Sequence, residues 1–376
     1  MFTFIFIIGH LDLLCTKSIK GHFRMEIKMN KKLLALAVIA ASSNAVAVEL
    51  YNEDGTTFDI GGHVSVALEG SDEGDTGLTA VSPRINFNAT HDLGNGFVAD
   101  AKGEGALNYL DGGENAFTTR LGYIGVTHND FGRMVAGTQW APYYSVAGVA
   151  DMPIAFANDF IYEDHGNLGT GRAEEMLSYG KMFELGDAGK LGVAAGWQGS
   201  KSDSVGNILP IENNYGNRAQ IALNYSVAGF SANYAYNTGD VNYGSVGAKS
   251  VTSESHVISG TYGTYGSGLY VAGVYAMNEN MNTPHKLSTT GSPIEDSSAY
   301  EALVAYALDN SLNLSLNYES VVDNDASKTV YSTSAIQAEY NFTKKFVGFT
   351  GYQVDLGNDY NNKDDNKWML GARYYL

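Results

Sequence analysis

The side chains that could carry nucleophilic, acid–base or metal chemistry lie far apart in this 376-residue chain. The histidines after residue 47 are isolated, with no His-x-x-x-His pair that would place two zinc ligands on one helix face. They are His63, His91, His128, His165, His256 and His285. The chain has no Gly-x-Ser-x-Gly nucleophile elbow, and the neighbours Ser255 and His256 would point to opposite faces of a strand. These residues predict no enzyme active site, no cofactor and no resident metal.

Charged and polar side chains instead alternate with apolar ones. The segment 312–319 reads Leu-Asn-Leu-Ser-Leu-Asn-Tyr-Glu, with an apolar residue at every second position. A β-strand turns successive side chains to opposite faces, so such a strand has one apolar and one polar face. The segment 57–69 is similar, with Asp59, His63 and Glu69 on its polar face. Because charges in a dry core are costly, we expect the polar faces to line a water-filled lumen and the apolar faces to meet lipid.

Sixteen segments share this alternation, and most have the roughly 9–11 residues that a tilted strand needs to cross a bilayer. They are 57–69, 81–91, 97–109, 117–128, 133–140, 172–181, 191–199, 218–226, 230–237, 254–263, 269–278, 298–308, 312–322, 330–342, 346–354 and 366–376. An even number of strands is typical of bacterial outer-membrane barrels. The sequence therefore predicts an all-β fold, a 16-stranded antiparallel transmembrane β-barrel.

The connections between these segments alternate between short turns and long polar loops. The short turns are 92–96, 129–132, 227–229, 264–268, 309–311 and 343–345, and the long loops are 70–80, 141–171, 200–217, 238–253, 279–297 and 355–365. Aromatic residues cluster beside the short turns, as expected for a girdle at the membrane interface. Outer-membrane barrels have short periplasmic turns and longer external loops, whereas a soluble sandwich has no reason to sort its loops in this way.

The region before the barrel has the features of an export signal. Residues 29–47 combine a basic start, an apolar run and Ala45-x-Ala47, which predicts a signal peptide cleaved before Val48. The apolar run is too short to span a bilayer as a helix. Because a signal peptide begins at the start codon, we interpret residues 1–28 as a mis-called upstream extension. The competing interpretation is a genuine extension with an apolar anchor.

Removal of this leader would change the composition of the chain. Cys15 is the only cysteine, so the mature chain 48–376 would have no disulfide, no thiol catalysis and no cysteine metal site. Residues 1–47 hold six of the 23 Lys and Arg and two of the 41 Asp and Glu, which leaves 17 basic and 39 acidic residues. The resulting net charge near −22 argues against nucleic-acid binding.

With these features the chain resembles the general diffusion porins of Gram-negative outer membranes, in particular their OmpU/OmpL-like branch. The resemblance covers 48–376 and is carried best by Thr-Arg-Leu-Gly-Tyr-Ile-Gly-Val at 119–126 and Phe-Gly-Arg-Met-Val-Ala-Gly-Thr-Gln-Trp at 131–140. It implies a homotrimer of barrels, each with a long third loop, here 141–171, folded into the lumen. It also implies passive passage of small hydrophilic solutes and ions.

The resemblance implies a pore constriction in which basic wall residues face acids of the third loop. Arg84, Arg120 and Arg172 match wall arginines of the family, whereas His63 stands where relatives often have a lysine. Wall charge at His63 would therefore be weaker and pH-dependent, because histidine titrates near neutrality. Lys102 is a further candidate, and Asp100 and Glu104 on the same polar face are expected to pair with it locally.

On the third loop, Asp151 is the first candidate for the opposing acid. The family pattern Pro-Glu-Phe-Gly-Gly-Asp is not kept after Pro153, so Asp159, Glu163 and Asp164 are candidates to replace the missing acid. Opposed charges across a narrow aqueous gap order water and dipolar solutes and set ion preference. The net negative charge predicts mild cation selectivity, although the arginines at the constriction could reverse it.

Two readings of another class remain open beside this one. A substrate-specific channel would need a continuous aromatic lining, but most tyrosines lie at strand positions that face outward. An adhesin or receptor barrel would use the exposed loops. The acidic segment 355–366 could bind a divalent cation, but it lacks the spacing and the terminal glutamate of an EF-hand. We favour a solvated loop, which calcium or magnesium could bridge to lipopolysaccharide. Expected partners are outer-membrane lipid, lipopolysaccharide and the barrel-insertion machinery, although the chain ends on Leu376 where the family usually has phenylalanine.

Overall fold

In a computed structural model of the chain, residues 47–376 are described apart from seven short gaps. The gaps are 111–116, 160, 162–165, 206–210, 245–248, 283–292 and 361–362, and the side chains of 203–205 and 211–212 also lie outside the description. The predicted upstream extension 1–28 and almost all of the predicted signal peptide 29–47 are outside the described residues. So are the candidates Glu163 and Asp164.

Strands dominate the part of the chain that is described, and all of their pairings are antiparallel. Their bounds are β1 (Val48–Glu53), β2 (Thr56–Ser71), β3 (Gly77–Ala80), β4 (Arg84–Gly94), β5 (Phe97–Leu107), β6 (Phe117–His128), β7 (Gly132–Trp140), β8 (Arg172–Glu184), β9 (Lys190–Gln198), β10 (Lys201–Val205), β11 (Ile211–Val227), β12 (Phe230–Tyr243), β13 (Val251–Thr264), β14 (Ser267–Glu279), β15 (Asp296–Ala307), β16 (Leu312–Asp323), β17 (Lys328–Thr343), β18 (Phe346–Asp355) and β19 (Lys367–Tyr375).

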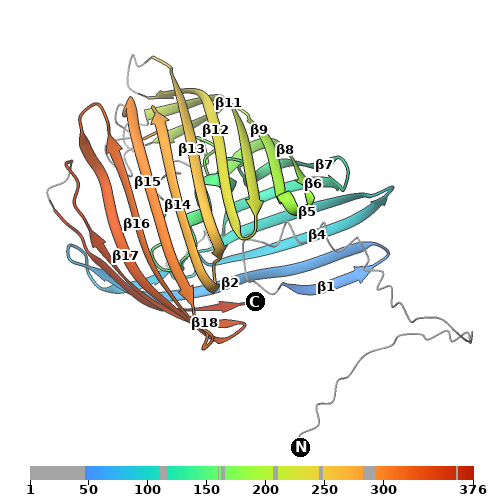
Figure 1. Cartoon of the computed structure of the whole chain (residues 1–376), viewed down its shortest axis with the longest axis horizontal. Coiled ribbons are helices and arrows are strands. Elements are labelled where there is room, and N and C mark those ends of the chain that lie inside the picture. Colours follow the sequence, from blue (N-terminus) through green and yellow to red (C-terminus); the bar gives the residue numbers. More distant parts are fainter. Residues whose placement is uncertain are drawn as a thin grey trace, which may run out of the picture. The chain divides into compact units, whose positions relative to one another are not determined.

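Sixteen of these strands close into a barrel, which confirms the predicted fold class (Figure 1). Closure runs from β2 through β4 to β9, on to β11 through β19, and back to β2 through the pairing of β19 with β2. Each of the sixteen predicted segments coincides with one strand of this wall. The strands β1, β3 and β10 were not predicted, and they pair with the ends of β2 and β11 outside the sixteen-strand cycle.

The two ends of the described chain meet on one edge of β2. The β19 strand pairs with 63–71 of β2, and β1 continues along the same edge from Ile60 to Thr56. The backbone N–H of Leu376 donates to the carbonyl of Gly62 at 3.1 Å, between these two partners. The hairpin of β1 and β2 therefore completes the part of the wall that β19 leaves unpaired.

The predicted alternation of faces is confirmed along β16. Leu314 and Leu316 are 44% and 55% exposed on the outer face, whereas Asn313 and Asn317 are 5% and 3% exposed on the inner face. An apolar outer face suits contact with lipid, and the polar inner face is covered by protein or faces the lumen. Among the described residues no helix is long and apolar enough to cross a membrane. The short helices α1 (Tyr144–Ala147) and η2 (Gly148–Ala150) lie in the third loop, and η4 (Gly186–Ala188) lies between β8 and β9.

Candidate functional site

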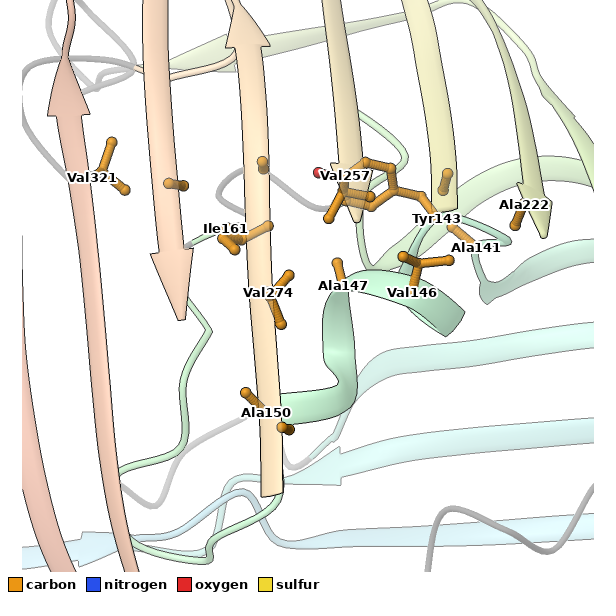
Figure 2. Packing of buried hydrophobic residues seen from close by; sticks show 14 of the residues in the cluster. Ala141, Tyr143, Val146, Ala147, Ala150, Ile161, Ala222, Val257, Val274 and Val321 are labelled. Carbon is orange, nitrogen blue, oxygen red and sulfur yellow. The ribbon is translucent and has the colours of Figure 1, made fainter. Parts of the chain in front are cut away.

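The third loop, 141–171, packs against the inner face of the barrel through α1 and η2 (Figure 2). Tyr143, Val146, Ala147 and Ala150 of this loop are completely buried. They pack in one cluster with small apolar side chains from the inner positions of β11 to β16, which are Ala222, Ala235, Val257, Ala272, Val274, Ala276, Ala299, Leu303, Ala305 and Val321. The expectation of a polar inner face is thus wrong for this part of the wall, because the loop replaces water there. The recurrence of alanine at inner positions was the sequence signal for this covering.

The first half of the loop is held by side chains that accept its backbone N–H groups. Glu339 accepts from Ile154 at 2.8 Å, Gln337 from Phe156 at 2.8 Å, and Glu319 from Asp159 at 3.1 Å. Glu301 accepts from Ile161 at 3.4 Å. We call Glu301, Glu319, Gln337 and Glu339 the acceptor row, and it lies on the inner faces of β15, β16 and β17.

The second half of the loop is held by amide side chains that donate to its carbonyls. Gln198 donates to the carbonyl of Gly166 at 2.6 Å, Gln220 to that of Gly169 at 2.8 Å, and Asn237 to that of Leu168 at 2.8 Å. We call Gln198, Gln220 and Asn237 the donor row. Neither row was predicted, because each joins residues that are distant in sequence. Together the rows fix the loop against the wall across β9 to β17.

A basic cluster lies on the opposite part of the wall and converges on Glu104 of β5. The Nε atom of Arg120 is 2.9 Å from Glu104 Oε1, a guanidinium nitrogen of Arg84 is 3.8 Å from the same oxygen, and Lys102 Nζ is 3.8 Å from Oε2. We define Arg84, Lys102, Arg120 and Glu104 as the basic wall. The expected local pairing of Lys102 with Glu104 is present, and the central place of Glu104 was missed because sequence alone does not bring three cations to one carboxylate.

Arg172 lies within electrostatic reach of this wall and of Asp151 on the third loop. Arg172 is the first residue of β8, and its charge interacts with Arg120, Glu104 and Asp151. Asp151 accepts a 2.6 Å hydrogen bond from the hydroxyl of Tyr144, whose ring stacks on Trp140 with 4.0 Å between centroids. Burial and the adjacent Asp151 carboxylate raise the pKa of Tyr144, so this hydroxyl remains a donor at neutral pH. The tyrosine was not among the predicted site residues.

The remaining described candidates are His63, which is buried, and Asp159, which lies on the part of the loop held by the acceptor row. His63 is buried, its Nε2 lies 2.8 Å from the carbonyl oxygen of Ser82, and its ring meets that of Tyr375 edge-on. Burial disfavours the protonated, charged form of His63. The predicted pH-dependent charge of His63 in the lumen stays a prediction. Asp159 lies over β16, where its backbone is bound by Glu319, on the loop half held by the acceptor row. Arg373 of β19, opposite Ser65, adds a basic side chain next to His63 that was not predicted for the constriction.

Comparison with known proteins agrees with this geometry. A family model described as Gram-negative porin matches residues 33–376. The porin-like protein L of Photobacterium profundum is 28% identical over 373 residues, covering 92% of this chain and 99% of that protein. Among solved structures, Salmonella typhi OmpF in complex with daunomycin has a TM-score of 0.71 at 20% identity, covering 88% of this chain and 100% of OmpF. The trimer form of Vibrio cholerae OmpT has a TM-score of 0.60 at 18% identity, covering 86% and 100%.

Proposed function

The chain belongs to the Gram-negative porin family and forms an outer-membrane β-barrel, and from this premise we propose that it is a general diffusion porin. Small hydrophilic solutes and ions would pass the water-filled lumen without a transport cycle. The observation that carries the proposal is the third loop, which is fixed across the inside of the wall opposite the basic wall around Glu104. We propose that a loop held in this position narrows the lumen, and the interaction of Asp151 with Arg172 supports this proposal.

Conductance of the purified, reconstituted barrel tests this proposal directly. A diffusion porin should give a current that rises linearly with voltage at low voltage and with salt concentration, without block by a particular solute. Concentration-dependent block by one solute class would instead support the substrate-specific channel. A barrel that conducts no ions would contradict both.

We further propose mild cation selectivity, which rests on the net charge near −22 of the mature chain. Long-range attraction enriches cations at the mouths, and the effect weakens as salt screens it. The basic wall and Arg172 oppose this tendency at the narrowest part of the lumen. A reversal potential under a salt gradient measures the balance, and a potential of the sign for anion preference would overturn the proposal.

We also propose that the working assembly is a homotrimer. The trimer form of OmpT has the same fold, and the outer face of β5 carries only small side chains at Ala99, Ala101 and Gly103. Those positions offer a flat surface against which another barrel can pack. Closure of single reconstituted channels in three equal conductance steps would support the trimer, whereas single-step closure would argue for a monomer.

Export is proposed to follow cleavage before Val48. The β1 strand begins at Val48, so cleavage there would leave the whole β1–β2 hairpin in the mature barrel. The mature chain would then meet the barrel-insertion machinery and pack among lipid and lipopolysaccharide. Amino-terminal sequencing of the protein from outer membranes checks the site, and a mature chain that begins upstream of residue 29 would refute the interpretation of 1–28.

A further inference from the structure

The short turn between β13 and β14 carries a tyrosine, Tyr265, whose side chain contacts the inner face of the barrel. Gly263 adopts a φ of +81°, and a Cβ there would lie 2.1 Å from the carbonyl oxygen of Leu269, so only glycine fits this turn. Its N–H donates to the carbonyl of Gly229 in the neighbouring turn at 2.9 Å. The turn is thereby fixed in a conformation that carries Tyr265 toward the lumen.

The side chain of Tyr265 reaches the inner face of β16 and β17. Its hydroxyl donates to Glu339 Oε1 at 3.1 Å and lies near the polar side chains of Asn313 and Ser315. Its ring meets that of Tyr270 edge-on, with 5.9 Å between centroids. Burial and the charge of Glu339 raise the pKa of Tyr265, which keeps the hydroxyl protonated as a donor at physiological pH.

Glu339 is the junction between this turn and the third loop. The oxygen that accepts from Tyr265 also accepts the 2.8 Å bond from the backbone N–H of Ile154, and the second oxygen accepts from Asn313 at 3.4 Å. On the same hairpin, the hydroxyl of Tyr270 donates directly to the carbonyl of Val149 at 2.7 Å. The β13–β14 hairpin therefore contacts the loop at two points, once directly and once through Glu339.

We propose that Tyr265 is a positioning residue of the pore, which braces the third loop from the short-turn end of the barrel by orienting the carboxylate of Glu339. This inference rests on the proposed diffusion function and adds a determinant that lies outside both the loop and the basic wall. The bonds from Tyr265 and Asn313 hold the Glu339 carboxylate in one orientation. In that orientation Oε1 can accept from the N–H of Ile154. Without Tyr265 the carboxylate gains rotamers that do not bind the loop, so the loop leaves its position more often.

Single-channel recording of the full-length, reconstituted protein with Tyr265→Phe tests the brace. We expect brief current fluctuations to become roughly 5- to 30-fold more frequent, the factor that corresponds to losing one buried hydrogen bond, while mean selectivity changes little. Tyr262→Phe is the matched control, because it removes the same hydroxyl from the same hairpin but its ring is exposed on the outer face, against Phe230. Channels of the control variant should show the same frequency of current fluctuations as channels of the unmodified protein.

A second comparison separates positioning from general damage to the barrel. In a Glu339→Ala background the phenol has no carboxylate to orient, so Tyr265→Phe should add nothing to the fluctuations already caused by Glu339→Ala. Equal fluctuations in Tyr265→Phe and unmodified channels would overturn the proposal, as would a full additional effect in the Glu339→Ala background. Failure of the unmodified protein to conduct would count against the diffusion function and not against the brace.

Discussion

The acceptor row and the basic wall are two sets of charges on one barrel that are used in different ways. The carboxylates of the acceptor row bind backbone N–H groups of the third loop. Glu319, for example, is 2% exposed and accepts from the N–H of Asp159. The side chains of the basic wall stay partly open, with Arg84 25% and Lys102 23% exposed. We therefore propose that the acceptor row sets the position of the loop, whereas the charges of the basic wall act on passing ions.

The difference predicts separate phenotypes. Variants of the acceptor row should alter conductance and current noise through the position of the loop. Variants of the basic wall should alter ion preference without moving the loop. The donor row provides an uncharged reference, because it binds the same loop with amides alone.

The largest effect is expected for Glu319→Ala combined with Glu339→Ala. Both changes leave backbone N–H groups of the loop without their acceptors, at about 1–3 kcal/mol each. The loop should loosen beside β16 and β17, where Gln337 would still bind Phe156, with higher conductance and strong current noise in bilayer recordings. The double variant Glu319→Gln with Glu339→Gln keeps an acceptor oxygen at each place and should retain most of the normal behaviour. If the glutamine pair were as noisy as the alanine pair, charge and not hydrogen bonding would hold the loop.

Glu104→Gln should produce the next largest effect, on selectivity. It removes the carboxylate shared by Arg84, Lys102 and Arg120, so the local charge becomes more positive by one unit. The reversal potential under a salt gradient should move toward anion preference, and the shift should shrink at high salt. Asp100→Asn is the matched control: it removes a carboxylate from the same face of β5, where Asp100 forms a bidentate ion pair with Arg133. A larger shift in the control would place the selectivity determinant away from Glu104.

A smaller effect is expected for Gln220→Ala in the donor row. It removes the donor to Gly169 and the acceptor for the N–H of Tyr143, but water entering the space left by the side chain can bond to both. Current noise should rise modestly, by a factor of a few at about 1 kcal/mol. Gln353→Ala, an inner-face glutamine of β18 bonded to Thr333, should leave the noise unchanged. Noise equal to that of the double alanine variant would show that the donor row holds the loop as strongly as the two carboxylates do.

Tyr144→Phe should have the smallest effect. It removes the hydroxyl that donates to Asp151, so the negative charge of the carboxylate is less offset and acts more strongly on Arg172 and passing cations. A slight shift of the reversal potential toward cations is expected. Because burial and Asp151 raise the pKa of Tyr144, its ionisation should contribute no change in selectivity between about pH 7 and 10. A tyrosine-dependent change within that window would show that the hydroxyl is exposed to bulk water.

The pairing of distant residues explains which parts of the site were beyond prediction. Ile154 meets Glu339 across 185 positions and Ile161 meets Glu301 across 140. Arg84, Arg120, Arg172 and Asp151 were predicted through the resemblance to the porins. The three arginines act on one another electrostatically and Asp151 acts on Arg172, while their role at a constriction stays a prediction. The added strands β1, β3 and β10 were missed because they extend neighbouring hairpins and carry no separate membrane-crossing pattern.

By itself the sequence determined the sixteen strands and their two faces, because lipid on one side and water or polar packing on the other act on every second residue. Because this constraint acts locally, short segments such as 312–319 show it in their alternation of apolar and polar residues. Only the tertiary structure decided where the loop 141–171 lies, which carboxylates hold it, and which alanines it covers. Those outcomes depend on closure of the wall, which brings strands from opposite ends of the chain around one lumen. The loop then packs against the partly apolar inner face of this wall.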